Sequence, residues 1–235
     1  MNIMEMVKVS ASREYTVNIG TGFLDTIGEK IREIKRPCRV VLVSDDTVFS
    51  LYGERVRKSL ADSGYSVCDF VFPHGEESKS FETYEKILEF CAENSITRTD
   101  LFVALGGGVT GDLTGFVAAS YLRGVDFIQI PTTVLAMVDS SVGGKTAINL
   151  KAGKNLCGAF YQPIVVYADC EVLNTLPPEI FNEGCAEIIK YGMICDKEFL
   201  EFLQNNSIKE NIEYVIRRCV ELKRDIVNRD EFEKG

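Results

Sequence analysis

The sequence is poor in the side chains that build most transition-metal sites. It contains one histidine, His74, and its eight cysteines show no CxxC pair or other metal-ligand spacing. Because zinc sites need three or four such ligands, these residues do not complete a metal site built on imidazoles. The cysteines lie mostly inside apolar segments such as ILEFCAEN. This placement is typical of reduced core thiols in a cytoplasmic protein and argues against a disulfide framework.

Long apolar runs and basic stretches are also absent. No apolar segment approaches the length of a membrane span, and the first residues, MNIMEMVKVSASREY, lack the basic-then-apolar pattern of a signal peptide. The formal charge is −9, with 35 acidic and 26 basic residues, so neither a membrane nor a nucleic acid is expected as a partner. Lysines inside motif segments therefore stand out, and they favour an anionic small molecule as the ligand. They are Lys79, Lys145, Lys154 and Lys190.

The first part of the chain alternates between short apolar runs and amphipathic helical patterns. Strands are expected over VVLVSDD, YSVCDFVFP and LFVALGG. Helices are expected over residues 46–64, closed by Gly64, and over residues 80–94, with Ser80 as the N-cap. Repeated strand–helix–strand units predict a mostly parallel sheet covered by helices, and 46% apolar residues suffice for a substantial core.

Several polar segments follow the expected strands directly. They are Asp45, residues 106–112 and Thr132–Thr133. Ligands on mostly parallel sheets bind beyond the carboxyl ends of the strands. We therefore expect one crevice to gather these segments.

The pattern becomes all-helical near residue 177. Pro177 and Pro178 are expected to open a helix that continues through EIFNEGCAEIIKYGMIC, and DKEFLEFLQNN follows it. A last helix is expected from Ser207, because Ser207 and Glu210 have the form of a capping box. The predicted fold is therefore an α/β domain over residues 1–176 followed by an all-α domain over residues 177–235.

A glycine-rich turn, GGGVTGD at residues 106–112, joins an expected strand to an expected helix. In that position the backbone N–H groups and the helix dipole face a diphosphate. Turns of this kind are often only tight turns. Asp112, directly after the glycines, favours a binding site, since its carboxylate suits the hydroxyls of a sugar or substrate.

The segment DSSVGGKTAIN is similar to the end of a Walker A loop, but Asp139 stands where the first glycine belongs. A P-loop is therefore rejected. Asp139 and Lys145, which lie six positions apart with two glycines between them, suit a hydroxylated and phosphorylated ligand. The alternative is a glycine hairpin with a solvated lysine, and this motif alone favours neither.

Two charged segments are weaker signals. In PHGEESKS, Glu76 and Lys79 lie between a strand and a helix, where charged loops are usually solvated. His74 in the same segment is more typical of a loop residue than of a ligand. In EGCAEIIKYG, Glu187 and Lys190 share a helical face. Spacing alone favours a surface ion pair there over a metal ligand at Glu187.

Taken together, these segments resemble the 3-dehydroquinate synthase family of sugar-phosphate cyclases. The matching blocks follow the family's order over essentially the whole chain: PHGEESKS, GGGVTGDLTGFVAASYLRG, QIPTTVLAMVDSSVGGKTAIN, GKNLCGAFYQP, LPPEIFNEGCAEIIKYG and ELKRDIVNRDEFEKG. Several blocks in register are far more specific than any one of them.

The resemblance implies a Rossmann-like domain that binds NAD, a helical C-terminal domain, and a catalytic divalent metal, zinc or cobalt, in the cleft between them. It also implies a homodimer, and 3-deoxy-D-arabino-heptulosonate 7-phosphate as the substrate, as in the shikimate pathway. A substrate hydroxyl would be oxidised transiently by NAD, phosphate would be eliminated, and the ketone would be reduced again. NAD would thus be regenerated in each turnover.

The resemblance also implies roles for individual residues. Those that would line NAD are Asp45, Glu76, Lys79, Gly107, Gly108, Val109, Asp112, Thr132 and Thr133. Those that would surround the substrate are Asp139, Lys145, Lys154, Asn155, Lys190 and Lys223, with Arg123 reaching the substrate phosphate of the partner subunit. Glu187 would be the first metal ligand. Several cations suit a substrate with one phosphate and one carboxylate.

The sequence departs from the family pattern at the metal site. The family supplies two metal-binding histidines from a segment that follows the DEFEKG block, and one carboxylate does not fix a catalytic zinc. The last helix is accordingly expected to expose an apolar face. Two alternatives stay open: a sister cyclase such as 2-deoxy-scyllo-inosose synthase, and a catalytically silent NAD-binding fragment. Iron-type alcohol and glycerol dehydrogenases are disfavoured, because the DSSVGGK and GKN blocks are those of the cyclases.

Overall fold

Seven strands form the central sheet of this computed structural model, which describes residues 4–235. Their order is β1-β2-β9-β6-β5-β3-β4, and every neighbouring pair is parallel except β1 with β2. The expected mostly parallel sheet is therefore confirmed. The strands are β1 (Glu5–Ser10), β2 (Glu14–Gly20), β3 (Arg39–Asp45), β4 (Ser66–Phe72), β5 (Leu101–Gly106), β6 (Asp126–Pro131) and β9 (Val165–Asp169).

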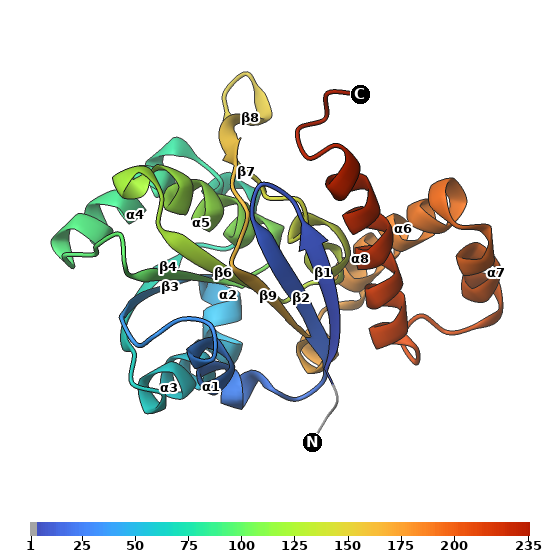
Figure 1. Cartoon of the computed structure of the whole chain (residues 1–235), viewed down its shortest axis with the longest axis horizontal. Helices are drawn as coiled ribbons and strands as arrows, with labels where there is room; N and C mark the ends of the chain where they lie inside the picture. Colours follow the sequence, from blue (N-terminus) through green and yellow to red (C-terminus); the bar gives the residue numbers. More distant parts are fainter. Residues whose placement is uncertain (1–3) are drawn as a thin grey trace.

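Helices cover both faces of the sheet, with α1 and α3 on one side and α4 and α5 on the other (Figure 1). Alternate side chains of a strand point to opposite faces. Val40 and Leu42 of β3 therefore join the core under α1 and α3, whereas Val41 and Val43 join the core under α4 and α5. These helices are α1 (Ile27–Arg32), α2 (Asp46–Val48), α3 (Glu54–Asp62), α4 (Phe81–Glu93) and α5 (Gly108–Ser120). Short 3₁₀ and π turns are η1 (Leu24–Thr26), η2 (Phe49–Gly53), η3 (Glu76–Ser78), η4 (Tyr121–Arg123), η5 (Ala136–Ser140) and η6 (Cys170–Thr175).

Local signals in the sequence account for most of these boundaries. Ser80 caps α4, because its hydroxyl accepts a hydrogen bond from the N–H of Thr83 at 3.3 Å. Gly64 ends the preceding helical region with a φ of +95°, a conformation that glycine adopts without strain. The single helix expected over residues 46–64 is instead divided into α2, η2 and α3. Gly53 lies at the end of η2, where a Cβ would clash with the ring of Phe49 at 2.4 Å.

Three helices follow the sheet along the chain: α6 (Pro178–Cys195), α7 (Lys197–Asn205) and α8 (Ile212–Arg229). Pro178 is the first residue of α6, where its missing N–H costs nothing. The prediction that the last helix begins at Ser207 is wrong, because Asn211 has a non-helical backbone and its side chain donates to the carbonyl of Ser207 at 2.9 Å. The domain division at residues 176/177 stays a prediction.

The expectation of an unburied apolar face on the last helix is also wrong. α8 packs against β1, β2 and η5, and Val215, Ile216, Cys219 and Val220 are all fully buried. Only Tyr214 and Ile226 of α8 are exposed among its large apolar side chains, at 36% and 43%. The most exposed apolar side chains of the helical region are Met193 and Ile194 of α6, at 70% and 74%.

Two antiparallel pairs were not expected from the sequence. One is β1 with β2, at an edge of the sheet. The other is a hairpin of β7 (Lys145–Leu150) and β8 (Gly153–Phe160), which projects from the body of the protein near the C-terminal segment (Figure 1). Gly143 and Gly144 lead into β7 with φ values of +104° and +66°, and the N–H of Gly143 donates to the hydroxyl of Tyr15 at 3.1 Å.

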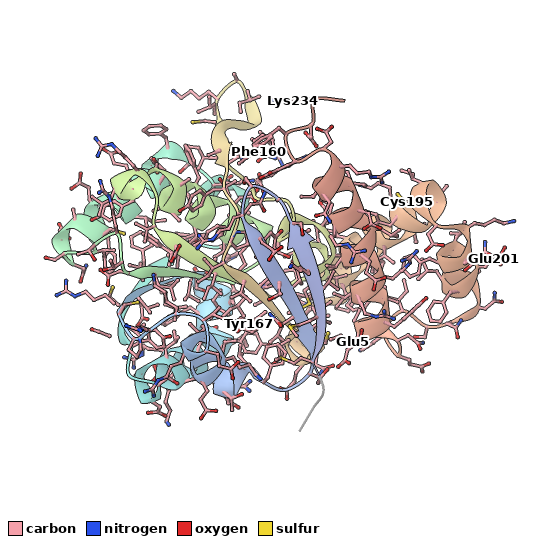
Figure 2. The ribbon with its side chains drawn as sticks, viewed as in Figure 1. Glu5, Phe160, Tyr167, Cys195, Glu201 and Lys234 are labelled. Atoms are coloured by element: carbon pink, nitrogen blue, oxygen red, sulfur yellow. The ribbon has the colours of Figure 1, made fainter. Side chains whose placement is uncertain are left out.

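All eight cysteines are free thiols, as expected. Cys91, Cys170 and Cys219 are buried, whereas Cys195 is exposed at the end of α6 (Figure 2). No helix within residues 4–235 has the length and apolar character needed to cross a membrane.

A buried carboxylate joins the end of β9 to the segment after β2. Asp169 is fully buried and accepts backbone hydrogen bonds from Gly22 at 2.7 Å and from Phe23 and Leu24 at 2.8 Å. An amide nitrogen cannot accept such bonds, so Asp169→Asn leaves at least one buried N–H unpaired. We expect the free energy of unfolding, measured by urea denaturation, to fall by about 1–3 kcal/mol.

The matched control is Asp62→Asn. Asp62 is exposed and pairs with Lys58 on the surface of α3 at 2.7 Å. Such helical pairs contribute about 0.5 kcal/mol or less. Equal losses in the two variants would contradict the role given to Asp169.

Candidate active site

A cavity of about 490 Å³, here called the first cavity, opens beyond the carboxyl ends of β3, β5 and β6. Its wall contains Asp45 from the end of β3, Gly107 and Gly108 from the turn after β5, and Thr132 and Thr133 from the turn after β6. The structure brings these segments together because the carboxyl ends of neighbouring parallel strands share one edge of the sheet.

The N-terminus of α5 faces the first cavity without a side-chain cap. Gly107 is the N-cap residue, and Gly107, Gly108 and Val109 all line the cavity. The first N–H groups of a helix have no partner within the helix, so they attract an anion such as a phosphate. A Cβ at Gly107 or Gly108 would lie 3.2 Å from the side chain of Thr133 or Ser140, respectively. Glycine therefore allows this turn to pack tightly and leaves its backbone open to a ligand.

A buried hydroxyl on the cavity wall lacks a partner. Thr132 is 3% exposed, and its Oγ1 makes no hydrogen bond with any residue that the structure describes. Leu135 and Ile180 give the same wall an apolar part. A helix end that accepts a diphosphate, an unused hydroxyl and an apolar surface are features that suit a dinucleotide. The residues of the first cavity therefore fit NAD.

A buried lysine links α5 to the β7–β8 hairpin. Lys79 is 4% exposed, forms an ion pair with Asp112 of α5, and donates from Nζ to Asn155 Oδ1 of β8 at 2.5 Å. Burial raises the pKa of Asp112 to about 6, against the opposing effect of Lys79, and the nearby carboxylates of Glu76 and Asp139 add to the rise. Asp112 therefore changes charge close to neutral pH.

Glu76 and Lys154 lie at the exposed edge of this cluster. Glu76 accepts a hydrogen bond from Asn149 Nδ2 at 2.7 Å, and Lys154 Nζ lies 3.7 Å from Glu76 Oε1. Lys154 is 74% exposed, so this pair contributes little stability. Its ammonium group is free to meet an anionic ligand.

A second cavity, of about 370 Å³, lies between the hairpin and the C-terminal segment. Asp112, Lys145 and Asn155 line it together with Phe160 and Glu233. Lys145 forms an ion pair with Glu233, and Figure 2 shows Phe160 of β8 near the end of the chain. Asp112 and Asn155 thus belong to both the Lys79 cluster and the second cavity.

Asp139 of η5 lies where the helices meet the sheet. Its Oδ1 accepts hydrogen bonds from the Tyr191 hydroxyl of α6 and from Lys223 Nζ of α8, both at 2.7 Å. Burial raises the pKa of Asp139, but Lys223, Tyr191 and Lys190 outweigh burial and hold that pKa below its ordinary value. Burial, and then the Asp139 carboxylate, raise the pKa of Tyr191. At neutral pH the site therefore contains a charged Asp139 and a protonated Tyr191.

Glu187 of α6 forms an ion pair with Lys190. Within residues 4–235 there is no group of three or more His, Cys, Asp or Glu side chains that could hold a metal ion. Catalytic zinc requires three protein ligands as a rule, and Glu187 supplies one carboxylate. The residues present therefore do not form a metal site by themselves.

Arg123 lies apart from both cavities. It is exposed in η4, directly after the C-terminal end of α5. α5 has 13 residues, so its two ends are about 20 Å apart. Leu122 and Arg123 both have positive φ, at +49° and +66°. The structure thus separates Arg123 from the other predicted site residues of the same chain.

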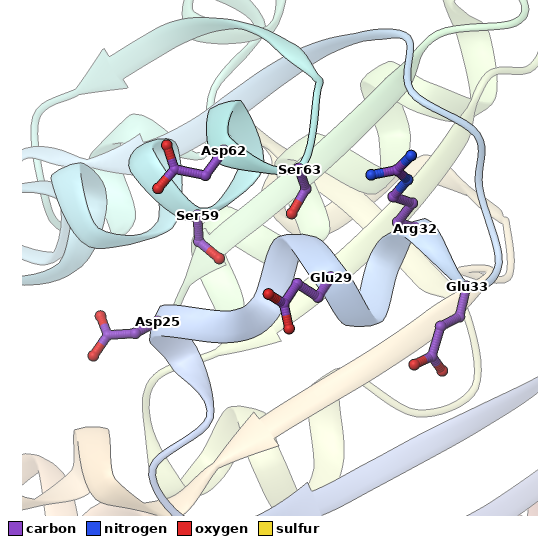
Figure 3. A pocket seen from close by; sticks show the side chains of 7 residues that line it. All are labelled: Asp25, Glu29, Arg32, Glu33, Ser59, Asp62 and Ser63. Carbon is purple, nitrogen blue, oxygen red and sulfur yellow. The ribbon is translucent and has the colours of Figure 1, made fainter.

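A third cavity, of about 360 Å³, lies between α1 and α3 (Figure 3). Its acidic side chains are partly neutralised, since Asp25 is held by Arg55 at 2.8 Å and Asp62 by Lys58 at 2.7 Å. It contains none of the residues predicted for the site.

Three further side chains at the site were not predicted: Tyr191, Glu233 and His74. Tyr191 follows Lys190 in the sequence and shares a buried face of α6 with Gly184 and Ile188. Helical spacing is the signal that indicates its inward position. His74 lies in a loop, as expected, but that loop also lines the first cavity.

Comparison with known families and structures identifies this arrangement. The family model described as 3-dehydroquinate synthase N-terminal matches residues 69–183, and the model described as 3-dehydroquinate synthase C-terminal matches residues 184–235. This chain belongs to the 3-dehydroquinate synthase family. The expected resemblance is therefore confirmed.

Relatives in this family are similar over nearly the whole chain. The 3-dehydroquinate synthase of Clostridium botulinum (strain Alaska E43 / Type E3) is 44% identical over 235 residues, which cover 98% of this chain and 67% of the relative. The 3-dehydroquinate synthase of Clostridium acetobutylicum is 45% identical over 225 residues, which cover 94% of this chain and 63% of that relative. The chain thus spans about two thirds of the length of these relatives.

Solved structures confirm the dehydroquinate synthase-like fold. A 2-deoxy-scyllo-inosose synthase complexed with carbaglucose-6-phosphate, NAD⁺ and Co²⁺ superposes with a TM-score of 0.87 at 29% identity, over 98% of this chain and 66% of that one. ValA is a 2-epi-5-epi-valiolone synthase from Streptomyces hygroscopicus subsp. jinggangensis 5008, with NAD⁺ and Zn²⁺ bound. It superposes with a TM-score of 0.87 at 28% identity, over 97% of this chain and 66% of ValA. An iron-containing alcohol dehydrogenase superposes with a TM-score of 0.69 at 17% identity, and this likeness shows a shared fold alone.

The raised pKa of Asp112 predicts a pH-dependent stability. Between the ordinary value of 3.8 and the folded value of about 6, the folded state binds more protons than the unfolded state, so stability falls as the pH rises. Asp112→Asn removes this titration. We expect wild type to lose about 1 kcal/mol more than Asp112→Asn between about pH 5 and about pH 7, measured by urea denaturation at each pH.

The exposed Asp62→Asn variant serves as the control and should follow wild type. If the free energy of unfolding changed with pH equally in wild type and Asp112→Asn, the pKa of Asp112 would be the same in the folded and unfolded chains. That result would contradict the prediction.

Proposed function

We propose that this chain provides the cofactor-binding and anion-binding residues of a 3-dehydroquinate synthase, which converts 3-deoxy-D-arabino-heptulosonate 7-phosphate to 3-dehydroquinate and phosphate. The observation that carries this proposal is the uncapped glycine end of α5 in the first cavity, beside the unpaired Thr132 hydroxyl. Relatives with that name at 44% identity, and similar structures that contain NAD⁺, support it.

NAD, when bound, would accept a hydride from a carbinol carbon of the substrate and return it later in the same turnover. The N–H groups of Gly108 and Val109 would bind its diphosphate. Asp45 Oδ1 already accepts the N–H of Val48 at 2.9 Å, which leaves Oδ2 for a ribose hydroxyl. Thr132 Oγ1 would gain its missing hydrogen-bond partner from the cofactor.

The second cavity and its surroundings provide cations for a phosphorylated sugar acid. Lys145 is half-exposed, and its partner Glu233 is also exposed, so a phosphate or carboxylate of the substrate would replace Glu233. Lys154 of β8 and Lys190 of α6 are also exposed, and two or more cations around a phosphate stabilise the charge that develops as it leaves. Asn155, on the wall of the same cavity, would donate to a substrate hydroxyl.

Asp139 would orient a substrate hydroxyl. Both of its protein hydrogen bonds, from Tyr191 and Lys223, reach Oδ1. Oδ2 makes none with the described residues and would accept from the substrate. Because Asp139 is charged at neutral pH, it is able to receive a proton or to fix the direction of an O–H bond.

The structural relatives contain Co²⁺ or Zn²⁺. Glu187 would contribute one carboxylate to such an ion, and its remaining protein ligands would come from outside residues 4–235. The proposal for this chain therefore concerns the binding of cofactor and substrate, and the whole reaction requires those further ligands.

A homodimer in the cytoplasm is part of this proposal. The distance between Arg123 and the N-terminus of α5 suits a residue that reaches the substrate phosphate of a partner subunit. Eight free thiols suit a reducing compartment.

A sister cyclase is less well supported. The 2-deoxy-scyllo-inosose synthase structure is 29% identical to this chain, against 44% for the 3-dehydroquinate synthase of Clostridium botulinum. Assays with alternative sugar phosphates separate the two functions.

The unpaired hydroxyl of Thr132 predicts a specific loss of NAD binding. Thr132→Val keeps the shape of the side chain and removes the hydroxyl. We expect NAD⁺ affinity, measured by calorimetry, to fall about 5- to 30-fold, because one hydrogen bond to the cofactor is lost. The free energy of unfolding without NAD⁺ should not fall, since the hydroxyl has no protein partner in the described residues.

Thr114→Val is the matched control. Thr114 is also fully buried with an unpaired hydroxyl, but it does not line the first cavity. Its affinity for NAD⁺ should equal that of wild type. An equal loss in both variants would point to a general effect on packing and would contradict the role of Thr132.

Phosphate release tests the reaction itself. Given NAD⁺, Zn²⁺ and 3-deoxy-D-arabino-heptulosonate 7-phosphate, the 235-residue chain should bind NAD⁺ without releasing phosphate, because residues 4–235 contain no group of three side chains that could hold the metal. A chimaera that adds the segment of the Clostridium botulinum relative that this chain does not match should release phosphate from this substrate. Lys145→Ala in the chimaera should lower kcat/KM by about 100-fold or more.

Two results would contradict this account. Phosphate release by the 235-residue chain alone, with its mass verified, would show that other residues hold the metal. If the chimaera released phosphate faster from a different sugar phosphate than from 3-deoxy-D-arabino-heptulosonate 7-phosphate, the result would favour the function of a sister cyclase.

A further inference from the structure

The first cavity carries little positive charge for a site that binds a dinucleotide. Among the side chains that line it in the described part of the chain, Asp45 and Glu183 are acidic, and neither Lys nor Arg occurs. The diphosphate of a dinucleotide is an anion, so its approach to these carboxylates costs electrostatic free energy. The N-terminus of α5 offsets part of that cost. The one lining side chain able to become cationic is His74.

Asp46 sets the orientation of this imidazole. The backbone N–H of His74 donates to Asp46 Oδ1 at 3.1 Å, and the ring Nδ1 lies 2.7 Å from the same oxygen. An imidazole bound to a carboxylate through Nδ1–H has its tautomer and ring direction fixed, which leaves Nε2 as the second binding atom. The side chain of His74 is 70% exposed, so Nε2 is accessible to a ligand in the cavity.

We propose that His74 is a dinucleotide-binding residue, which in its protonated form contacts NAD through Nε2–H while Asp46 holds the ring. This inference rests on the proposed function, because the first cavity is the NAD site assigned there. NAD binding is then accompanied by proton uptake at His74. By linkage, the affinity for NAD rises as the pH falls through the titration range of the imidazole.

The charged groups near His74 are carboxylates. They are Asp46 of α2, which His74 contacts, Asp45 of β3 and Glu183 of α6, which line the same cavity, and Glu76 and Glu77 of η3, which follow His74 in the sequence. The nearest lysine of the same segment, Lys79, is buried in its ion pair with Asp112. The hydrogen bond from His74 holds the pKa of Asp46 below its ordinary value, so Asp46 is charged at neutral pH.

A proton NMR titration tests the proposal directly. His74 is the only histidine in the sequence, so its ring C–H resonances are assigned without ambiguity. Saturating NAD⁺ should move the titration midpoint of these resonances to higher pH by about 0.5–1 unit, and NAD⁺ should bind about three- to tenfold more tightly at about pH 5.5 than at about pH 8.5. An unchanged midpoint with NAD⁺ bound would overturn this inference and leave the proposed function in place.

Variants separate the effect of His74 from that of Asp112, whose pKa is raised to about 6. His74→Gln keeps a hydrogen-bonding side chain that cannot be protonated. It should match wild type in NAD⁺ affinity at about pH 8.5 and bind about three- to tenfold more weakly than wild type at about pH 5.5. Asp46→Asn should lower the titration midpoint of the His74 resonances, because the neighbouring carboxylate is lost.

Glu77→Gln is the matched control, since Glu77 is exposed and does not line the first cavity. It should retain the pH dependence of wild type. A His74→Gln chain with the full pH dependence of wild type would overturn the inference. Failure of NAD⁺ to bind at any pH would overturn both the inference and the NAD site of the proposed function.

Discussion

The buried ammonium group of Lys79 is the constraint on which both cavities depend. An unpaired charge at such a position would cost several kcal/mol, so Lys79 fixes the positions of Asp112 in α5 and Asn155 in β8. Its backbone carbonyl also accepts the N–H of Asn149 at 2.8 Å. Lys79 thereby connects α5, whose N-terminus faces the first cavity, to the β7–β8 hairpin, which lines the second cavity. The ion pair also keeps a titratable carboxyl group, that of Asp112, on the wall of the second cavity.

The parallel sheet determines where binding takes place, and the helices after it add the reactive charges. The ends of β3, β5 and β6 supply backbone amides and small hydroxyls, which suit a large cofactor that must be held in a fixed orientation. Lys190 and Lys223, by contrast, come from α6 and α8, and both lie close enough to Asp139 to lower its pKa. In the proposed function, the ends of these strands bind the cofactor, and the β7–β8 hairpin together with α6 and α8 binds the substrate.

The sequence predicted the parallel strands and their helices well, because a buried strand such as Leu101–Gly106 is a continuous apolar run and the Ser80 cap is a local signal. It missed the β7–β8 hairpin, because all positions of β8 are exposed or intermediate and leave no buried face for the sequence pattern to indicate. It also missed the contacts of Tyr191 with Asp139 and of His74 with Asp46. These join residues 52 and 28 positions apart, and such contacts are set by tertiary packing. The glycine turn after β5 was predictable, since its spacing reflects a requirement of the backbone itself.

We propose that this chain binds NAD through the residues of its own α/β region. The most direct measurement is the stoichiometry of NAD⁺ binding by isothermal calorimetry, with a chelator present to remove divalent metals. We expect one NAD⁺ per chain, with the same affinity whether or not the chelator is added, because no described residue that lines the first cavity belongs to a metal site. Absence of binding at millimolar NAD⁺, or binding that disappears with the chelator, would contradict it.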